Sequence, residues 1–255
     1  MNVTSADLSI LLPALAAGLL VTATHVPLGM QVLARGIVFI DLAIAQIAGC
    51  GVLLADRLGF EAEGIAVQVA ALSAALAGAL LLTWTERIWP DVQEAVIGVV
   101  FVLAATGGAL LLANNVHGSE HLRDLLVGQI LWAQPSRLLW AAAVYAVVLF
   151  LWFGWKEKLG RTGFYALFAV AVTVSVQLVG LYLVFATLIV PPLATRHMAK
   201  GRLAASWAIG AVGYALGLFI STATDVPSGP VIVWTLCGVG LTAYVATSNT
   251  KRRQP

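Results

Sequence analysis

Hydrophobic residues form long runs along this chain, and short segments between the runs carry the charged residues. Eight blocks hold no Asp, Glu, Lys or Arg apart from one aspartate in the second block: 8–34, 36–55, 64–85, 95–119, 138–155, 162–195, 203–224 and 226–250. Most are close to the ~20 residues with which a helix crosses the ~30 Å hydrocarbon core of a bilayer. The pattern predicts an all-α polytopic integral membrane protein with about eight transmembrane helices.

One block, 162–195, is too long for a single crossing. It contains Gly180 near its middle and ends in Pro191 and Pro192, which cannot donate backbone hydrogen bonds. We therefore expect a helix broken near Gly180 to Pro192. The block then holds either one crossing with a short buried segment or two short crossings.

The composition agrees with a membrane protein. Hydrophobic residues make up 60% of the chain and charged residues 10%, against the ~25% charged residues of a soluble domain. The net charge of +2 is too small to indicate a nucleic-acid partner. The longest charged connector, 120–137, is too short for a soluble domain. Residues 1–255 are thus expected to be a single transmembrane domain in the lipid bilayer, and any energy source or soluble receptor would be another chain.

The distribution of Lys and Arg bears on orientation, because cytoplasmic loops are enriched in these residues. With eight crossings and the N-terminus inside, nine of the 14 Lys and Arg residues lie inside. With nine crossings and the N-terminus outside, eleven of the 14 do. Both arrangements place the 196–202 loop and the Lys251 to Arg253 tail in the cytoplasm.

Asp41 is the only charged residue between positions 36 and 55. An ionised carboxylate at membrane depth is costly unless it faces water, protein or a cation. Asp41 is therefore predicted to lie on a cation pathway, with Gln46 as a nearby polar partner. The alternative is a buried polar pair that only fixes helix packing.

Histidines supply further candidates for metal ligands. His25 lies in the first apolar block, where it is either a satisfied core residue or a ligand on a metal route. In VHGSEHL, a helix would place His117 and His121 on one face with Glu120 beside them, so that they could bind one metal ion.

The same VHGSEHL segment matches the HxxEH signature of a class of metallopeptidases, which leaves an intramembrane metallopeptidase as an alternative function. Against this alternative, Gly118 weakens the helix and no third ligand is evident. A polar helix end at the membrane surface explains the segment equally well.

A basic segment follows the two prolines, from Ala194 to Ser206. A short amphipathic cytoplasmic helix here could engage a soluble motor, whereas the simpler explanation is a positive-inside anchor. The candidate residues of this segment are Arg196, His197, Lys200, Gly201 and Arg202.

Several segments, in order, resemble the permease subunits of zinc- and manganese-type ABC transporters. RGIVFIDLAIAQIAG resembles the second-helix motif of this family, and EAVIGVVFVLAATGGALLL with LRDLLVGQILW resembles its fourth helix and the following stretch. VQLVGLYLVFATLIVPPLATRHMAKGR is similar to the segment that leads into the coupling helix, and DVPSGPVIV to the turn before the last helix.

The resemblance implies the membrane subunit of an importer in the bacterial cytoplasmic (inner) membrane. Its implied partners are a second permease copy or paralogue, a pair of cytoplasmic ATP-binding subunits and an extracytoplasmic metal-binding protein. The chain would not be an enzyme and would hold no permanent cofactor, since ATP is hydrolysed on the partner subunits. The family topology implies eight spans with both termini inside.

The resemblance also implies roles for individual residues. Asp41 aligns with the aspartate of the metal path, whereas the histidine of the motif is replaced by Ala45, which leaves His25 as a possible substitute. Arg35 corresponds to a docking position for the binding protein, and Arg196 to Arg202 correspond to the ATPase-coupling segment.

The sequence thus predicts an ABC importer subunit for a divalent transition metal ion, with zinc first and manganese or iron next. The remaining alternative in the transport class is an ion-coupled secondary transporter.

Overall fold

The computed structural model describes residues 5–61, 64–112, 126 and 130–252, and these residues fold into helices without a strand. The all-α prediction is confirmed. The helices are α1 (Ser5–Arg35), α2 (Ile40–Arg57), α3 (Ile65–Ile88), α4 (Gln93–Leu112), α6 (Pro135–Val179), α7 (Leu181–Ala194), α8 (Arg202–Thr224) and α9 (Ser228–Arg252), with the short 3-10 helices η1 (Pro90–Val92) and η2 (Ile130–Trp132).

Helix α6 is two membrane-length helices joined by a reversal. Non-helical backbone at Trp155 and Gly160, where Gly160 has φ 59°, divides it into Pro135–Trp155 and Glu157–Val179. With these two counted separately, seven helices of the described part of the chain are long and apolar enough to cross a membrane. Helix α2, with 18 residues, and α7, with 14, complete the bundle.

The predicted break in the 162–195 block occurs at Gly180. This residue has φ 86° and ψ 161°, a combination that L-residues with a side chain avoid, and it separates α6 from α7. Pro191 and Pro192 do not break the helix, which continues to Ala194. They lie in its last two turns, where only two backbone hydrogen bonds are lost.

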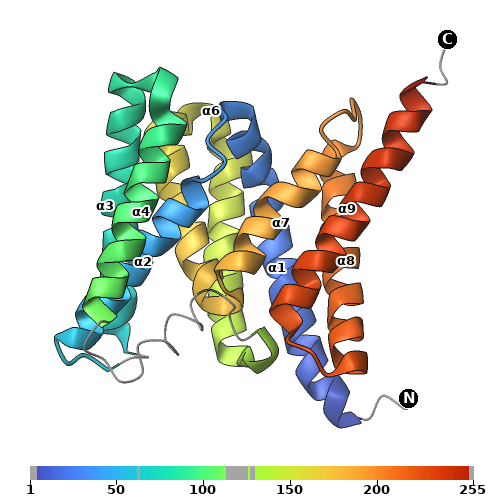
Figure 1. Ribbon diagram of the computed structural model, residues 1–255, viewed down its shortest axis with the longest axis horizontal. Helices are drawn as coiled ribbons and strands as arrows, with labels where there is room; N and C mark the ends of the chain where they lie inside the picture. Colours follow the sequence, from blue (N-terminus) through green and yellow to red (C-terminus); the bar gives the residue numbers. More distant parts are fainter. Residues whose placement is uncertain (1–4, 62–63, 113–125, 127–129, 253–255) are drawn as a thin grey trace.

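The two ends of the chain lie at opposite ends of the bundle. In Figure 1, α1 begins at the lower end and α9 finishes at the upper end, because α7 returns the chain upward from Gly180. The described helices therefore make nine alternating passes, counting α7 and both halves of α6. The path differs from the arrangement implied by the family resemblance in placing the two termini at opposite ends of the bundle. The prediction of about eight transmembrane helices agrees with the seven long apolar helices and the shorter α2 and α7 of the described residues.

The turn between α7 and α8, residues 195–201, lies at the upper end in Figure 1, which we call the loop end. Most basic residues in the described part of the chain lie at this end: Arg35, Arg87, Lys156, Lys158, Arg161, Arg196, Lys200, Arg202, Lys251 and Arg252. Arg57 and Arg137 lie at the opposite end. The distribution is that of the nine-crossing arrangement considered from the sequence.

Small residues let α1, α7, α8 and α9 pack closely. A Cβ atom on Gly29 of α1 would collide with the backbone oxygen of Leu188 in α7. A Cβ atom on Gly217 of α8 would lie 2.6 Å from the Cα atom of Ile232 in α9. Backbone-to-backbone approach of this kind is how helices pack in lipid, where apolar burial supplies little driving force.

Candidate cation site

Asp41 lies in the first turn of α2 and is fully buried. Neither of its carboxylate oxygens has a hydrogen-bond partner of normal geometry among the described residues. The free N–H groups at the start of a helix carry partial positive charge, which stabilises a carboxylate there. This does not replace a partner, and an unpaired buried carboxylate in a membrane protein marks a functional position.

A second carboxylate, Glu94, acts on Asp41. It is the second residue of α4, and its charge interacts electrostatically with that of Asp41. Its Oε1 atom accepts a hydrogen bond of 3.2 Å from the backbone N–H of Phe39, the residue that precedes α2. Its Oε2 atom is buried and has no hydrogen-bond partner within the described structure. The hydrogen bond to Phe39 thus places Glu94 near the start of α2.

Sequence reasoning did not identify Glu94 as a site residue. Glu94 borders the apolar block 95–119, where an acidic residue is ordinarily the solvated end of a membrane helix. The available signal was the segment match that begins at Glu94, but only the packing of α4 beside α2 places Glu94 near the start of α2.

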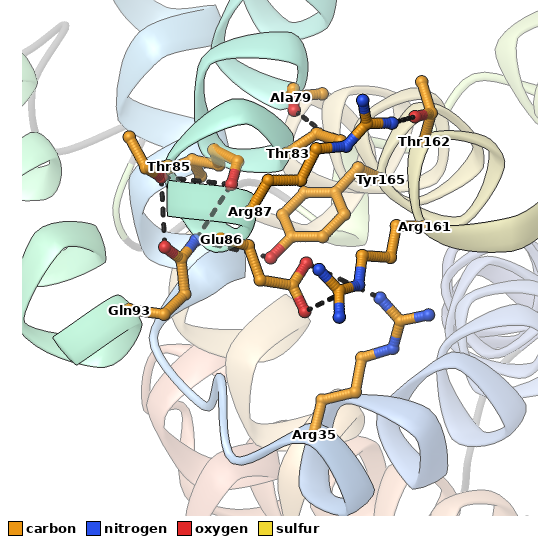
Figure 2. Close-up of polar contacts among 11 residues, drawn as sticks. Arg35, Ala79, Thr83, Thr85, Glu86, Arg87, Gln93, Arg161, Thr162 and Tyr165 are labelled. Atoms are coloured by element: carbon orange, nitrogen blue, oxygen red, sulfur yellow. Dashed lines mark hydrogen bonds and ion pairs between the residues drawn. The ribbon is translucent and has the colours of Figure 1, made fainter. Parts of the chain in front are cut away.

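The neighbouring residue Gln93 fixes the start of α4. Its side-chain amide donates to the Leu82 carbonyl at 3.0 Å, and its Oε1 accepts from the Thr85 hydroxyl at 3.0 Å. Figure 2 shows this amide between the side chains of α3 and Tyr165. Because Gln93 is buried and held on α3, the next residue, Glu94, is held toward α2.

An apolar groove of about 590 Å³ lies between α2 and α4, and neither Asp41 nor Glu94 lines it. Its walls include Leu42, which follows Asp41, and Ala95, which follows Glu94. Phe39 also lines the groove and stacks on Phe185 of α7, with ring centroids 6.4 Å apart.

Gln46 is half-buried on α2. Five residues after Asp41, it lies roughly 140° around the helix from the aspartate, whereas Ala45, four residues on, shares the face of Asp41. Its role beside Asp41 stays a prediction.

His25 is buried on α1, with its Nδ1 atom 3.1 Å from the Val21 carbonyl oxygen. Since a carbonyl only accepts hydrogen bonds, Nδ1 carries the proton and Nε2 offers a lone pair. Nε2 is buried without a partner in the described structure, as is the hydroxyl of Thr22 one turn earlier. Nε2 is therefore available to bind a metal ion.

The structure does not join His25 to Asp41. Helix α1 packs on α6, α7 and α8, whereas α2 packs mainly on α3 and α4. No group of three His, Cys, Asp or Glu side chains that could hold a metal occurs in the described ranges. The predicted cluster of His117, Glu120 and His121 lies outside the described residues.

Arg35 belongs to a cluster at the loop end. Its Nη1 atom lies 3.9 Å from Oε2 of Glu86, and Nε of Arg161 lies 3.7 Å from Oε1 of the same carboxylate. The Arg35 guanidinium also lies 4.5 Å from the centre of the Phe164 ring. Figure 2 shows both arginines converging on Glu86, so that this carboxylate ties the ends of α1 and α3 to the second half of α6.

The predicted roles of Arg35 and of the 196–202 loop require opposite sides of the membrane. Arg35 was expected to dock an extracytoplasmic protein, and the loop to contact a cytoplasmic ATPase. Both lie at the loop end, since α1 and α7 run side by side in the same direction and Gly29 of α1 packs on the C-terminal half of α7. The two predictions are therefore incompatible.

Residues 195–201 form turns, not the short amphipathic helix that the sequence left open beside a positive-inside anchor. The Arg202 guanidinium donates to the Pro192 carbonyl at 3.2 Å, and the hydroxyls of Thr195 and Ser206 lie 2.6 Å apart. Gly201 takes the left-handed conformation, with φ 68°, that starts α8. These contacts close the turn tightly.

The remaining predicted residues of this turn divide into two groups. His197 packs its ring on Tyr244 of α9, with centroids 4.5 Å apart, and this contact holds the turn against α9. Arg196 and Lys200 are exposed at its tip.

Comparison with known proteins agrees with this architecture. The chain superimposes on a chain of PsaBC from Streptococcus pneumoniae, solved in complex with Fab, with a TM-score of 0.72 and 23% identity over 92% of this chain and 89% of that one. It also superimposes on a metal-chelate type ABC transporter in an inward-facing conformation, with a TM-score of 0.69 and 15% identity over 94% and 85% of the two chains. No curated protein sequence matches at a significant level.

The model of one protein family, described as the ABC 3 transport family, matches residues 7–162 and 154–247, which is nearly the whole chain. The match confirms the resemblance that the sequence segments suggested. Because this match covers nearly the whole chain, the chain belongs to the ABC 3 transport family.

Proposed function

We propose that this chain is the membrane-spanning subunit of an importer for a divalent transition metal ion, with zinc as the first ion to test and manganese or iron next. ATP hydrolysis on separate subunits powers the transport. The proposal includes a bacterial inner-membrane location, a second permease copy and an extracytoplasmic metal-binding protein.

The main support for this proposal is the environment of the Asp41 side chain. It is fully buried in an apolar bundle, it has no hydrogen-bond partner of normal geometry among the described residues, and Glu94 adds a second negative charge. A transported cation passing this point would relieve both the missing partner and the like-charge repulsion. Weak binding by few ligands would let the ion leave again.

The ATPase subunits would bind at the loop end of the bundle. Because basic residues concentrate there, the positive-inside rule assigns the loop end to the cytoplasm and the start of α1 to the outside. Arg196 and Lys200 would then contact the ATPase, while Gly201, His197 and Arg202 keep the turn in shape. Arg35 would lie on the cytoplasmic side, and its interactions with Glu86 and Phe164 make it a structural residue rather than a docking residue.

Uptake of metal by the reconstituted transporter tests the function. The chain would be purified with its ATPase and placed in liposomes with its binding protein, and uptake of Zn²⁺ and Mn²⁺ would be measured with and without ATP. We expect ATP-dependent uptake that falls to background in Asp41→Asn. The matched control is Asp56→Asn, at the exposed far end of the same helix, which should transport normally.

Two other outcomes would contradict parts of this proposal. Uptake that does not need ATP but follows a proton or sodium gradient would make the chain a secondary transporter. Full uptake by Asp41→Asn at wild-type abundance would remove Asp41 from the pathway.

A further inference from the structure

Basic side chains gather at the loop end where the last turn of α3 meets the reversal between the two halves of α6. We call residues 84–89 and 155–162 together the α3–α6 corner. Arg161 lies 3.7 Å from Glu86, a carboxylate that it shares with Arg35. Beside them, Nη2 of Arg87 donates a hydrogen bond of 3.1 Å to the hydroxyl of Thr162. Figure 2 shows these side chains together, with one carboxylate between two guanidinium groups and a third guanidinium group next to them.

Two cations of the corner have no ion pair among the described residues. Arg87 is exposed, and its hydrogen-bond partner Thr162 is neutral. Lys158 is exposed near the start of the second half of α6. The exposed carboxylates of Asp91 and Glu157 form no ion pair with either cation. The Thr162 hydroxyl accepts the bond from Arg87, so its own proton can be donated to a further group. The corner therefore offers positive charge and hydrogen-bond donors to an anion.

Exposed apolar side chains lead from the corner along α3 toward the middle of the bundle. Leu80, Trp84 and Ile88 are spaced four residues apart, so they share one face of α3, and all three are exposed. Trp89 packs edge-on against Trp84, with ring centroids 5.9 Å apart. Tryptophan near the end of a membrane helix lies at the level of the lipid headgroups. This face of α3 therefore runs from hydrocarbon depth at Leu80 to headgroup depth beside Arg87.

A phospholipid carries the complementary groups in the same order. A guanidinium group can bind two oxygens of a phosphate, and Arg161 keeps N–H groups available because its side chain is 50% exposed. An acyl chain fits the exposed apolar face of α3, which a small soluble anion would not use. Basic pockets between helices on the cytoplasmic side of a membrane attract anionic headgroups, and the positive-inside rule assigns the loop end to that side.

We propose that the α3–α6 corner binds one anionic phospholipid of the leaflet at the loop end. Arg87, Arg161 and Thr162 hold its phosphate, and Trp84 and Leu80 contact its acyl chain. The site does not depend on which ion is transported. It also lies apart from the proposed ATPase contact, because α3 is at the edge of the bundle away from α8 and α9, whereas the 195–201 turn leads into α8 (Figure 1).

Native mass spectrometry of the purified full chain in detergent tests the site, because it counts the lipids bound to each protein. The chain would be titrated with phosphatidylglycerol and, separately, with zwitterionic phosphatidylcholine. We expect the first phosphatidylglycerol to bind more tightly than phosphatidylcholine. Arg87→Gln should weaken its binding roughly fivefold, the effect of ~1 kcal/mol per basic residue near the membrane surface. Equal affinity for the two lipids, or unchanged binding by Arg87→Gln, overturns the proposal.

Two matched variants separate a local site from general attraction to positive charge. Arg57→Gln removes an exposed cation at the opposite end of the bundle, and Lys200→Gln removes one at the loop end away from the corner. Both should bind phosphatidylglycerol as the wild type does, and a loss equal to that of Arg87→Gln would contradict a local site. Since Arg87 bonds to an exposed hydroxyl, Arg87→Gln should keep the wild-type thermal transition, which distinguishes lost binding from misfolding.

Two further measurements identify the occupant. Trp84→Ala should weaken phosphatidylglycerol binding, and inorganic phosphate at an equal concentration should not displace the lipid. Unchanged binding by Trp84→Ala together with displacement by phosphate would make the corner a site for a soluble anion. Titration of the chain assembled with its ATPase subunits should give the same bound lipid. Its loss on assembly would assign the corner to a protein contact and overturn the lipid site.

Discussion

Arg35 and Glu86 form an ion pair of 3.9 Å that joins the end of α1 to the end of α3, and Arg161 approaches the same carboxylate at 3.7 Å. The side chain of Glu86 is 14% exposed, so removing its charge leaves two arginines without their common partner. Glu86→Gln is expected to lower stability by about 1 kcal/mol, because these pairs are long and partly screened by solvent.

For a chain of this size that loss corresponds to ~2–4 °C in the thermal transition of the detergent-solubilised protein. Asp91→Asn, which removes an exposed carboxylate near the same end of the bundle, serves as the control and should not change the transition. Equal transitions for all three proteins would show that the cluster adds nothing to stability.

Gly180 is expected to tolerate no side chain. Its φ of 86° and ψ of 161° lie in a region that costs other residues ~1–3 kcal/mol. Gly180→Ala should therefore lower the thermal transition. Gly238→Ala is the matched change, because a Cβ atom at this position of α9 meets no other atom within 4 Å. A Gly180→Ala protein as stable as Gly238→Ala would contradict the need for glycine at the break.

The orientation of the bundle can be read from labelling of single cysteines in a background without Cys50 and Cys237. An impermeant maleimide added to intact cells should label Arg57→Cys at once, and Lys158→Cys and Lys200→Cys only after the membrane is opened. Lys158 distinguishes the two topologies, because eight spans with both termini inside would place it outside. Labelling of Lys158→Cys from outside, with Lys200→Cys protected, would restore the eight-span arrangement.

Residues of the turn between α7 and α8 should divide into those that couple to the ATPase and those that stabilise the turn. Arg196→Ala and Lys200→Ala remove exposed charges and are expected to reduce ATP-driven uptake without lowering the thermal transition of the chain. Arg202→Ala removes a charged hydrogen bond to the Pro192 carbonyl and should cost roughly 1.5 kcal/mol of stability. Unimpaired uptake by the double variant Arg196→Ala, Lys200→Ala would remove these residues from the coupling contact.

Hydrophobic patterning predicted the all-α fold, because a membrane helix needs a long apolar run. The length of the 162–195 block, with its glycine and prolines, predicted a break near Gly180 to Pro192, and only the structure places it at Gly180. The pattern did not decide that α7 returns to the loop end. A 14-residue helix is too short to be recognised as a crossing from its length, and only its antiparallel position after α6 reveals the ninth pass.

Asp41 could be identified from the sequence because a lone carboxylate in an apolar run is costly wherever the run lies in the membrane. Glu94 could not, since an acidic residue at the edge of an apolar block is ordinarily solvated. Arg35 was assigned a docking role only by resemblance. Its ion pair with Glu86 and its contact with the Phe164 ring could be seen only in the structure.

The sequence by itself determined that this protein lies in a membrane, where its long apolar helices are and which carboxylate in them is exceptional, because those properties depend on the free energy of transferring each residue into lipid. The tertiary structure decided which end of the bundle each charged residue occupies and that Glu94 of α4 binds the backbone at the start of α2. Those relationships arise from helix direction and from contacts between helices that are distant in sequence, and local patterns carry no information about either.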